Sequence, residues 1–120
     1  MNLTLDLMIM SGVDDGQVLN FATESGDGLM GDDNWTITLG RREGNDVCLR
    51  NDTYASRYHA RLSWQDRRWW LEDCTSKNGT YIEGATEDVR VEGTIALEPG
   101  QLFRIGRTWL RIQAAGLAES

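Results

Sequence analysis

Short segments in which apolar and polar residues alternate recur along this sequence and restrict the folds open to it. The first, LTLDLMI at residues 3–9, places its three leucines and Ile9 on one side of an extended chain, and Thr4, Asp6 and Met8 on the other. A period of two is that of a half-buried β-strand. Similar short runs lie at 35–39, 46–49, 60–64, 68–73, 80–84, 94–97, 101–105 and 108–112.

Turn signals separate these runs, and no window shows a sustained helical period of 3.6. The signals are glycine-containing pairs at 11–12, 15–16, 44–45, 78–79 and 99–100. Many short strands at a spacing of about 8 to 12 residues are typical of an all-β sandwich. The pattern therefore predicts an all-β chain folded as a two-sheet β-sandwich, whose loops gather at the ends of the sheets.

Length and composition indicate one globular domain. The chain has 120 residues, of which 40% are hydrophobic and 26% charged, which is typical of a folded soluble domain rather than a disordered one. No apolar run approaches the roughly 20 residues that cross a bilayer, and the first ten residues carry Asp6 but no Lys or Arg. We expect no membrane partner, a domain at 1–113, and a linker or tail at 114–120, where the sequence becomes AAGLAES after Gln113.

The distribution of charge says more than its sum of −7. Residues 1–39 hold seven acids and no Lys or Arg, whereas residues 40–78 hold eight bases and six acids. Because a nucleic-acid-binding protein needs a strongly basic surface, we expect no nucleic-acid partner. The local excess of positive charge in the middle third points instead to a small anionic ligand.

Neither the cysteines nor the acidic residues form a recognisable metal or disulfide pattern. Cys48 and Cys74 match no CxxC motif and no disulfide-rich scaffold, so we interpret them as reduced packing residues of a cytoplasmic domain. The stretch Ala22–Asn34 is interpreted as a long acidic loop. Calcium binding there is an alternative, but the loop lacks the spacing of a calcium-binding loop. We expect neither a metal nor a cofactor.

The single histidine, His59, follows Ser56 by three residues, and this raises the question of catalysis. Residues three apart in an extended chain point to opposite faces, so the two side chains can meet only through a turn. The G-x-S-x-G motif is absent, and one histidine cannot supply a His-rich metal site. We therefore expect no enzymatic activity and interpret His59 as a structural residue that holds two loops together.

Three loops in the basic third share one composition. Gly40-Arg41 follows a predicted strand, Ser56-Arg57 precedes one, and the segment 76–80 (SKNGT) joins two. Each of these loops has a cationic residue next to a glycine or to a residue with a short hydroxyl or amide side chain. In a sandwich such loops can meet at one end, where they would form a single anion-binding surface.

Three segments, LGRREGNDVCL, ASRYHARL and LEDCTSKNGTYIEG, together make the sequence resemble the forkhead-associated (FHA) domain family. They match its Gly-Arg, Ser-Arg-x-His-Ala and L-x-D-x-x-S-x-N-G-T motifs in order and at compatible spacing. The resemblance implies a β-sandwich of about eleven strands, with the binding loops at one end, that recognises phosphothreonine in an extended peptide. Arginine clusters are a recurrent means of capturing phosphorylated peptides.

The resemblance also implies a role for each motif residue. Arg41 would pair with the phosphate, Ser56 would donate its hydroxyl, and Arg57 and Lys77 would lie beside the phosphate. Asn78 would bind the peptide backbone through its amide, which can donate and accept together. Four residues would shape the loops without touching the ligand: Gly40, His59, Gly79 and Thr80.

These assignments predict a non-enzymatic adaptor that docks its host on proteins phosphorylated by Ser/Thr kinases. A phosphothreonine brings about −1.5 to −2 charges and three acceptor oxygens, which suit the planar fork of arginine. The alternative is a structural FHA-like module that binds partners without phosphate. Among the five tryptophans, Trp69 is expected in the core and Trp70 on the outer face of the same strand.

Overall fold

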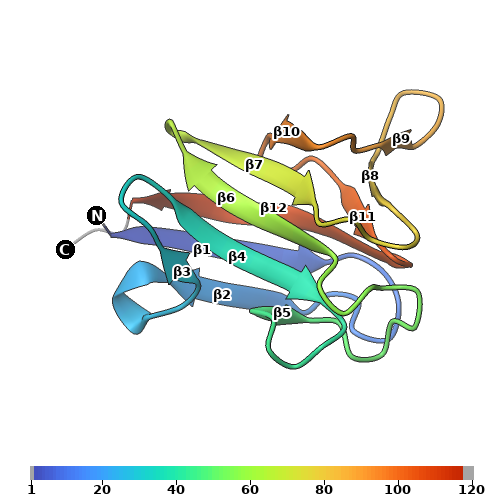
Figure 1. The fold of residues 1–120 in the computed structure, drawn as a ribbon, viewed down its shortest axis with the longest axis horizontal. Helices are drawn as coiled ribbons and strands as arrows, with labels where there is room; N and C mark the ends of the chain where they lie inside the picture. The colour runs from blue at the N-terminus through green and yellow to red at the C-terminus, as the bar shows by residue number, and fades with distance from the viewer. Residues whose placement is uncertain (1, 118–120) are drawn as a thin grey trace.

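The computed structural model describes residues 2–117 and consists of β-strands joined by turns and loops (Figure 1). The strands are β1 (Leu3–Ile9), β2 (Val18–Ala22), β3 (Leu29–Met30), β4 (Trp35–Gly40), β5 (Val47–Cys48), β6 (Ala60–Gln65), β7 (Arg68–Asp73), β8 (Thr80–Ile82), β9 (Val89–Arg90), β10 (Thr94–Leu97), β11 (Phe103–Ile105) and β12 (Thr108–Leu117).

Two sheets pack face to face. Sheet A has the strand order β2-β1-β12-β11-β8-β9, and sheet B has the order β10-β7-β6-β4-β3, with β5 pairing in parallel with β4. The two-sheet all-β sandwich predicted from the sequence is confirmed, with twelve strands in the described part of the chain in place of about eleven. Within residues 2–117 the one helical element is the 3-10 turn Thr23–Ser25, and no helix there is long and apolar enough to cross a membrane.

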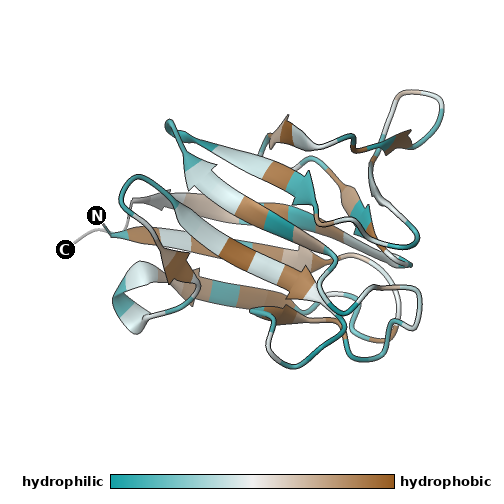
Figure 2. Ribbon diagram, viewed as in Figure 1, coloured by the Kyte–Doolittle hydropathy of each residue, from teal (hydrophilic) through white to brown (hydrophobic). Residues whose placement is uncertain are grey.

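The alternation seen in the sequence becomes the core of the sandwich. In β1 every second side chain from Leu3 to Ile9 is buried, and Trp35, Ile37 and Leu39 are buried in β4. Figure 2 shows the hydropathy of the residues along these strands. These side chains meet inward-facing residues of β6, β7, β11 and β12 between the sheets. The fully buried side chains include Leu5, Leu7, Trp35, Ile37, Leu39, Leu62, Leu71, Phe103, Ile105, Leu110 and Ile112.

The tryptophans of β7 lie on opposite faces, as predicted. Trp69 is 3% exposed, and its ring lies 5.8 Å from that of Trp35 and 5.7 Å from that of Trp64, measured between centroids. Trp70 is half-buried on the outer face, where the Arg68 guanidinium lies 5.4 Å from its ring centre. The aromatic contacts of Trp69 therefore contribute to the core between the sheets.

Three strands, β2, β3 and β9, were not predicted from the sequence. The segment 22–34 was expected to be one loop, but it contains the 3-10 turn Thr23–Ser25 and strand β3, and it begins at the end of β2. The strands β2, β3 and β9 are formed by backbone pairing at sheet edges. The residues of β3 and β9 are exposed, and β2, although its Leu19 and Phe21 pack against the core, has the sequence VLNFA, in which apolar and polar residues do not alternate regularly.

The end of the chain also differs from the expectation. Residues 114–117, placed in a linker or tail, continue β12 and pair with β1, from Asp6 opposite Ala114 to Leu3 opposite Leu117. The register shifts between Asp6 and Leu7, which indicates a bulge. Backbone hydrogen bonds to β1 account for this extension, and they leave no side-chain pattern. Residues 118–120 of the expected tail lie outside the described residues.

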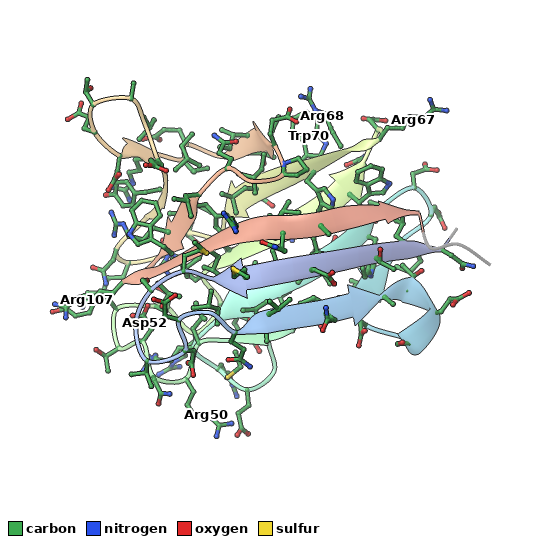
Figure 3. All side chains as sticks on the ribbon, turned by 180° about the vertical axis from the view of Figure 1, so that it is seen from behind. Arg50, Asp52, Arg67, Arg68, Trp70 and Arg107 are labelled. Atoms are coloured by element: carbon green, nitrogen blue, oxygen red, sulfur yellow. The ribbon has the colours of Figure 1, made fainter. Side chains whose placement is uncertain are left out.

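Strand directions bring three connections to one end of the sandwich. These are the connection after β4, the one between β5 and β6, and the one between β7 and β8. All three lie at the end of the sandwich where β1 finishes, away from the end where it begins (Figure 1). Arg50, Asp52 and Arg107 lie at this same end, whereas Arg67 lies at the far one (Figure 3). The loops that carry the predicted site residues are therefore neighbours in space.

Candidate functional site

Backbone hydrogen bonds hold the first of these loops against the second. The first loop is residues 41–46, and the second is residues 49–59. The Arg41 N–H donates to the Ser56 carbonyl at 3.0 Å, and the Arg42 N–H donates to the Arg57 carbonyl at 3.3 Å. The main chain thus places two predicted site residues, Arg41 and Arg57, in neighbouring loops. Among residues 2–117 neither side chain forms an ion pair.

The third loop, residues 74–79, is tied to the second by the side chains of predicted site residues. The Ser56 Oγ accepts the Lys77 N–H at 3.0 Å, and the Asn78 Nδ2 donates to the Tyr54 carbonyl at 2.9 Å. A hydroxyl that accepts one hydrogen bond still has its own proton to donate. Ser56 is therefore positioned with a donor available for a ligand.

His59 links the second loop to the third through the two nitrogens of its ring. Its side chain is fully buried, its Nδ1 accepts the Ser56 N–H at 2.9 Å, and its Nε2 lies 2.9 Å from the Gly79 carbonyl. An N–H on one side and a carbonyl on the other require a neutral ring that carries its proton on Nε2. The Ser56 hydroxyl bonds to Lys77 and not to this ring, so the pair lacks the nucleophile–base hydrogen bond of a catalytic serine.

Burial lowers the pKa of His59, although the Gly79 carbonyl and the charges of Asp73 and Asp52 oppose this. The unfolded chain, with a histidine pKa of about 6.5, then takes up a proton before the folded one as the pH falls. We expect the free energy of unfolding contributed by His59 to be constant above about pH 6.5 and to decrease below it. Urea unfolding between pH 7.5 and 5 measures this loss, which the variant His59→Gln should lack; equal slopes in both proteins would contradict the assignment.

Asp73, at the end of β7, organises the turn that presents Lys77 and Asn78. Its carboxylate accepts the Ser76 hydroxyl at 2.5 Å, the Ser76 N–H at 3.2 Å and the Thr80 hydroxyl at 2.7 Å. The Ser76 Oγ in turn accepts the Gly79 N–H at 2.9 Å. Burial alone would raise the pKa of Asp73, but these hydrogen bonds outweigh it and hold the pKa below its usual range.

The predicted framework glycines occupy positions where a side chain cannot fit or the backbone favours glycine. A Cβ on Gly40 would lie 2.2 Å from the Arg57 carbonyl oxygen and 2.8 Å from the Asn45 Nδ2. Gly79 has a φ of +84°, in the left-handed region that side chains disfavour. Gly40 permits the close approach of the first two loops, and Gly79 permits the turn after Asn78.

Two buried residues that sequence reasoning did not single out also shape the loops. Asn45 is 6% exposed, and its Nδ2 donates to the carbonyls of Arg42 at 2.8 Å and Arg57 at 2.7 Å. Asp52 is 8% exposed and accepts the Tyr54 N–H, the Arg107 N–H and the Thr108 hydroxyl. Each was visible in the sequence only as a residue in a turn or a charged residue in a loop.

All five side chains predicted to bind a phosphopeptide line one open cleft of about 560 Å³. Arg41, Arg57, Lys77 and Asn78 are exposed there, and Ser56 is half-buried. The walls are completed by Thr53, Tyr54, Ala55, Tyr58 and Cys74. The cleft therefore presents three cations, a hydroxyl donor and an amide. Such groups are suited to bind an anion that is attached to an extended chain.

The acidic stretch near the N-terminus offers no comparable site. Among residues 2–117 no group of three or more His, Cys, Asp or Glu could hold a metal ion. Asp27, within this stretch, accepts the Ala22 N–H through its carboxylate, and its carbonyl accepts the Trp35 Nε1 proton. Cys48 and Cys74 are both free and partly exposed.

The structure thus combines a two-sheet β-sandwich with three loops that bring exposed cations together at one end. The family model of the FHA domain matches residues 37–106, which include every predicted site residue. The chain therefore belongs to the FHA domain family.

Individual relatives agree with this assignment. The FHA domain-containing protein FhaB of Mycobacterium tuberculosis is 35% identical over 77 residues, which are 64% of this chain and 46% of FhaB. The chain thus spans about half the length of this relative. Among solved structures, the FHA domain of an Arabidopsis thaliana hypothetical protein has a TM-score of 0.73 at 22% identity and covers 98% of this chain and 90% of its own. Mycobacterium tuberculosis EmbR in complex with a low-affinity phosphopeptide has a TM-score of 0.69 at 19% identity, over 98% of this chain and 26% of its own.

Proposed function

We propose that this domain is a non-enzymatic adaptor module that binds phosphothreonine in an extended peptide segment of a partner protein. The observation that carries the proposal is the convergence of Arg41, Ser56, Arg57, Lys77 and Asn78 on one cleft. Family membership supports it, since EmbR, which shares the fold, is described in complex with a phosphopeptide. The structural roles of Gly40, His59, Gly79 and Thr80 support it further, because each acts on the loops that carry those side chains.

Each ligand-facing residue has a distinct part in this proposal. Arg41 pairs with two phosphate oxygens, and the Ser56 hydroxyl donates to the phosphate while its oxygen continues to accept the Lys77 N–H. Arg57 and Lys77 add positive charge at the side of the phosphate. Asn78 either gives up the hydrogen bond from its Nδ2 to the Tyr54 carbonyl and donates to a peptide carbonyl instead, or keeps that bond and accepts a peptide N–H at its Oδ1.

The affinity should be moderate. Three or four charge-assisted hydrogen bonds at roughly 1.5 to 3 kcal/mol each oppose an association cost of about 4 to 15 kcal/mol, so the phosphate contacts alone cannot give picomolar binding. We expect micromolar affinity, to which contacts of the flanking peptide contribute. Burial of the threonine methyl group adds about 0.8 kcal/mol, near fourfold over phosphoserine. Dependence on phosphate makes a Ser/Thr kinase the upstream partner, and a cytoplasmic location, where such kinases act, is part of the same proposal.

The alternative is a phosphate-independent protein-interaction module with the same fold. Fluorescence polarisation with an oriented phosphothreonine peptide library, run beside unphosphorylated and phosphoserine versions, separates the two functions. Micromolar binding confined to phosphorylated peptides, and strongest for phosphothreonine, is the expected result. Equal affinity for the unphosphorylated library would overturn the proposal and favour the alternative.

A further inference from the structure

A second hollow adjoins the proposed phosphate cleft and is lined by arginine alone. Arg41, Arg42 and Arg57 surround a volume of about 400 Å³, and two of them, Arg41 and Arg57, also line the main cleft. The two hollows are therefore neighbours that share these two side chains. Asn78 and Lys77 line only the main cleft, so the arginine hollow lies to the side of Arg41 and Arg57 that is away from Asn78.

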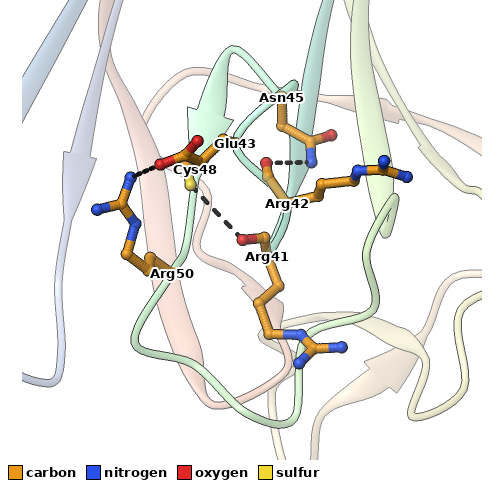
Figure 4. A network of polar contacts seen from close by, with 6 residues as sticks. All are labelled: Arg41, Arg42, Glu43, Asn45, Cys48 and Arg50. Carbon is orange, nitrogen blue, oxygen red and sulfur yellow. Dashed lines mark hydrogen bonds and ion pairs between the residues drawn. The ribbon is translucent and has the colours of Figure 1, made fainter.

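The three guanidinium groups have no counter-ion in the part of the chain that the structure describes. Among residues 2–117 the ion pairs involve other arginines, and none involves Arg41, Arg42 or Arg57. The nearest acid in sequence, Glu43, is paired with Arg50, and Arg41 and Arg42 extend away from that pair (Figure 4). Three like charges gathered without a counter-ion repel one another, and this is notable in a chain of net charge −7.

The arrangement is built rather than incidental, because a buried side chain fixes it. Both bonds of the Asn45 Nδ2 go to the Arg42 and Arg57 carbonyls, which holds the two arginine backbones together. Gly40 lets this junction close, since a Cβ there would collide with the Arg57 carbonyl and the Asn45 amide. The backbone of Arg42 is thus held in place while its side chain stays exposed. Such preorganisation lowers the cost of ordering the site when a ligand binds.

We propose that this arginine hollow is a second anion subsite, which binds an acidic or phosphorylated side chain of the same peptide on one side of the phosphothreonine. The inference rests on the proposed function, because the phosphothreonine anchors the peptide in the adjoining cleft. An extended peptide advances about 3.3 Å per residue, so the second anion lies within roughly four residues of the phosphothreonine. Carboxylate and phosphate share the geometry that an arginine fork recognises, and phosphate carries the larger charge.

The test is a positional scan on a phosphothreonine peptide whose other residues are uncharged. One glutamate or one phosphoserine is placed at each position up to four residues on either side, and the gain in affinity over alanine at that position is measured. We expect a gain of about tenfold at one or two positions on one side only, larger for phosphoserine than for glutamate. In Arg42→Ala the gain at those positions should fall to less than twofold, while Arg68→Ala, a remote loss of the same charge, should retain it.

The outcomes separate this inference from the proposed function. A gain that persists in Arg42→Ala, or no gain at any position in the wild-type protein, would overturn the second subsite while leaving phosphothreonine binding intact. Failure of the uncharged phosphothreonine peptide to bind would overturn the proposed function first and the subsite with it. Because Arg42 contributes its backbone, and not its side chain, to the loop contacts, truncation to alanine should preserve the fold; a thermal melt checks this.

Discussion

Replacing Arg41 by alanine is expected to weaken the binding of a phosphothreonine peptide at least 100-fold and to leave thermal stability nearly unchanged. The side chain is exposed and forms no ion pair among the described residues, while its backbone N–H holds the loop. Two charge-assisted hydrogen bonds to phosphate are worth roughly 3 to 6 kcal/mol, and 100-fold corresponds to about 2.7 kcal/mol. Fluorescence polarisation and a thermal melt on the same samples measure both effects.

Two further variants make this result specific. Arg68→Ala removes the same charge on the outer part of sheet B, where the side chain pairs with Glu98, and it should leave peptide affinity within about twofold. Arg41→Lys keeps the charge but loses the planar fork, so an intermediate loss of about tenfold is expected. Wild-type affinity in Arg41→Ala would place the ligand elsewhere and support the phosphate-independent alternative.

The motifs predicted which side chains lie together because they lie in loops whose spacing is fixed by the strands between them. The alternation in 35–39, 60–64 and 68–73 located the central strands of sheet B, and those strands deliver Arg41, Ser56 and Lys77 to one end of the sandwich. The structural interpretation of His59 also agrees with its buried position between two loops. What each ligand-facing side chain does to a peptide stays a prediction until binding is measured.

Residues that act through burial or backbone pairing were less visible. Asn45 and Asp52 look like ordinary polar loop residues in the sequence, and only the fold shows that each satisfies several buried groups. The arginine hollow depends on Asn45 in this way, so the sequence alone does not indicate that Arg42 lies beside Arg41 and Arg57. The edge strand β3 and the end of β12 likewise rest on backbone hydrogen bonds, which carry no side-chain pattern.

Different residues hold the loops in place and line the proposed binding cleft. The buried residues His59, Asn45 and Asp52 and the half-buried Asp73 hold the loops together, whereas the exposed groups line the cleft that we propose for the ligand. Variants of the exposed arginines should therefore change affinity with little change in stability. Variants of the buried residues should change both, because the loops lose their positions when the supporting hydrogen bonds are lost.

Replacing His59 by alanine is expected to cause the largest loss of stability among the site residues, about 3 to 5 kcal/mol. The change opens a cavity and leaves the buried Gly79 carbonyl and the Ser56 N–H without partners, and each such group costs roughly 1 to 3 kcal/mol. In a domain of this size the melting temperature should fall by more than 10 °C, since 1 kcal/mol corresponds to about 4 °C. Thermal and urea unfolding measure the loss.

Two conservative variants divide the effect between its bonds. His59→Gln places an amide N–H near the position of Nε2 and can still donate to Gly79, whereas His59→Asn places an oxygen near Nδ1 and can still accept from Ser56. Each should retain about half of the stability that alanine loses. If all three variants lose the same free energy, the cavity accounts for the loss and the two hydrogen bonds contribute nothing. A graded series would show that the imidazole stabilises the site by linking the loop of Ser56 to the loop of Asn78.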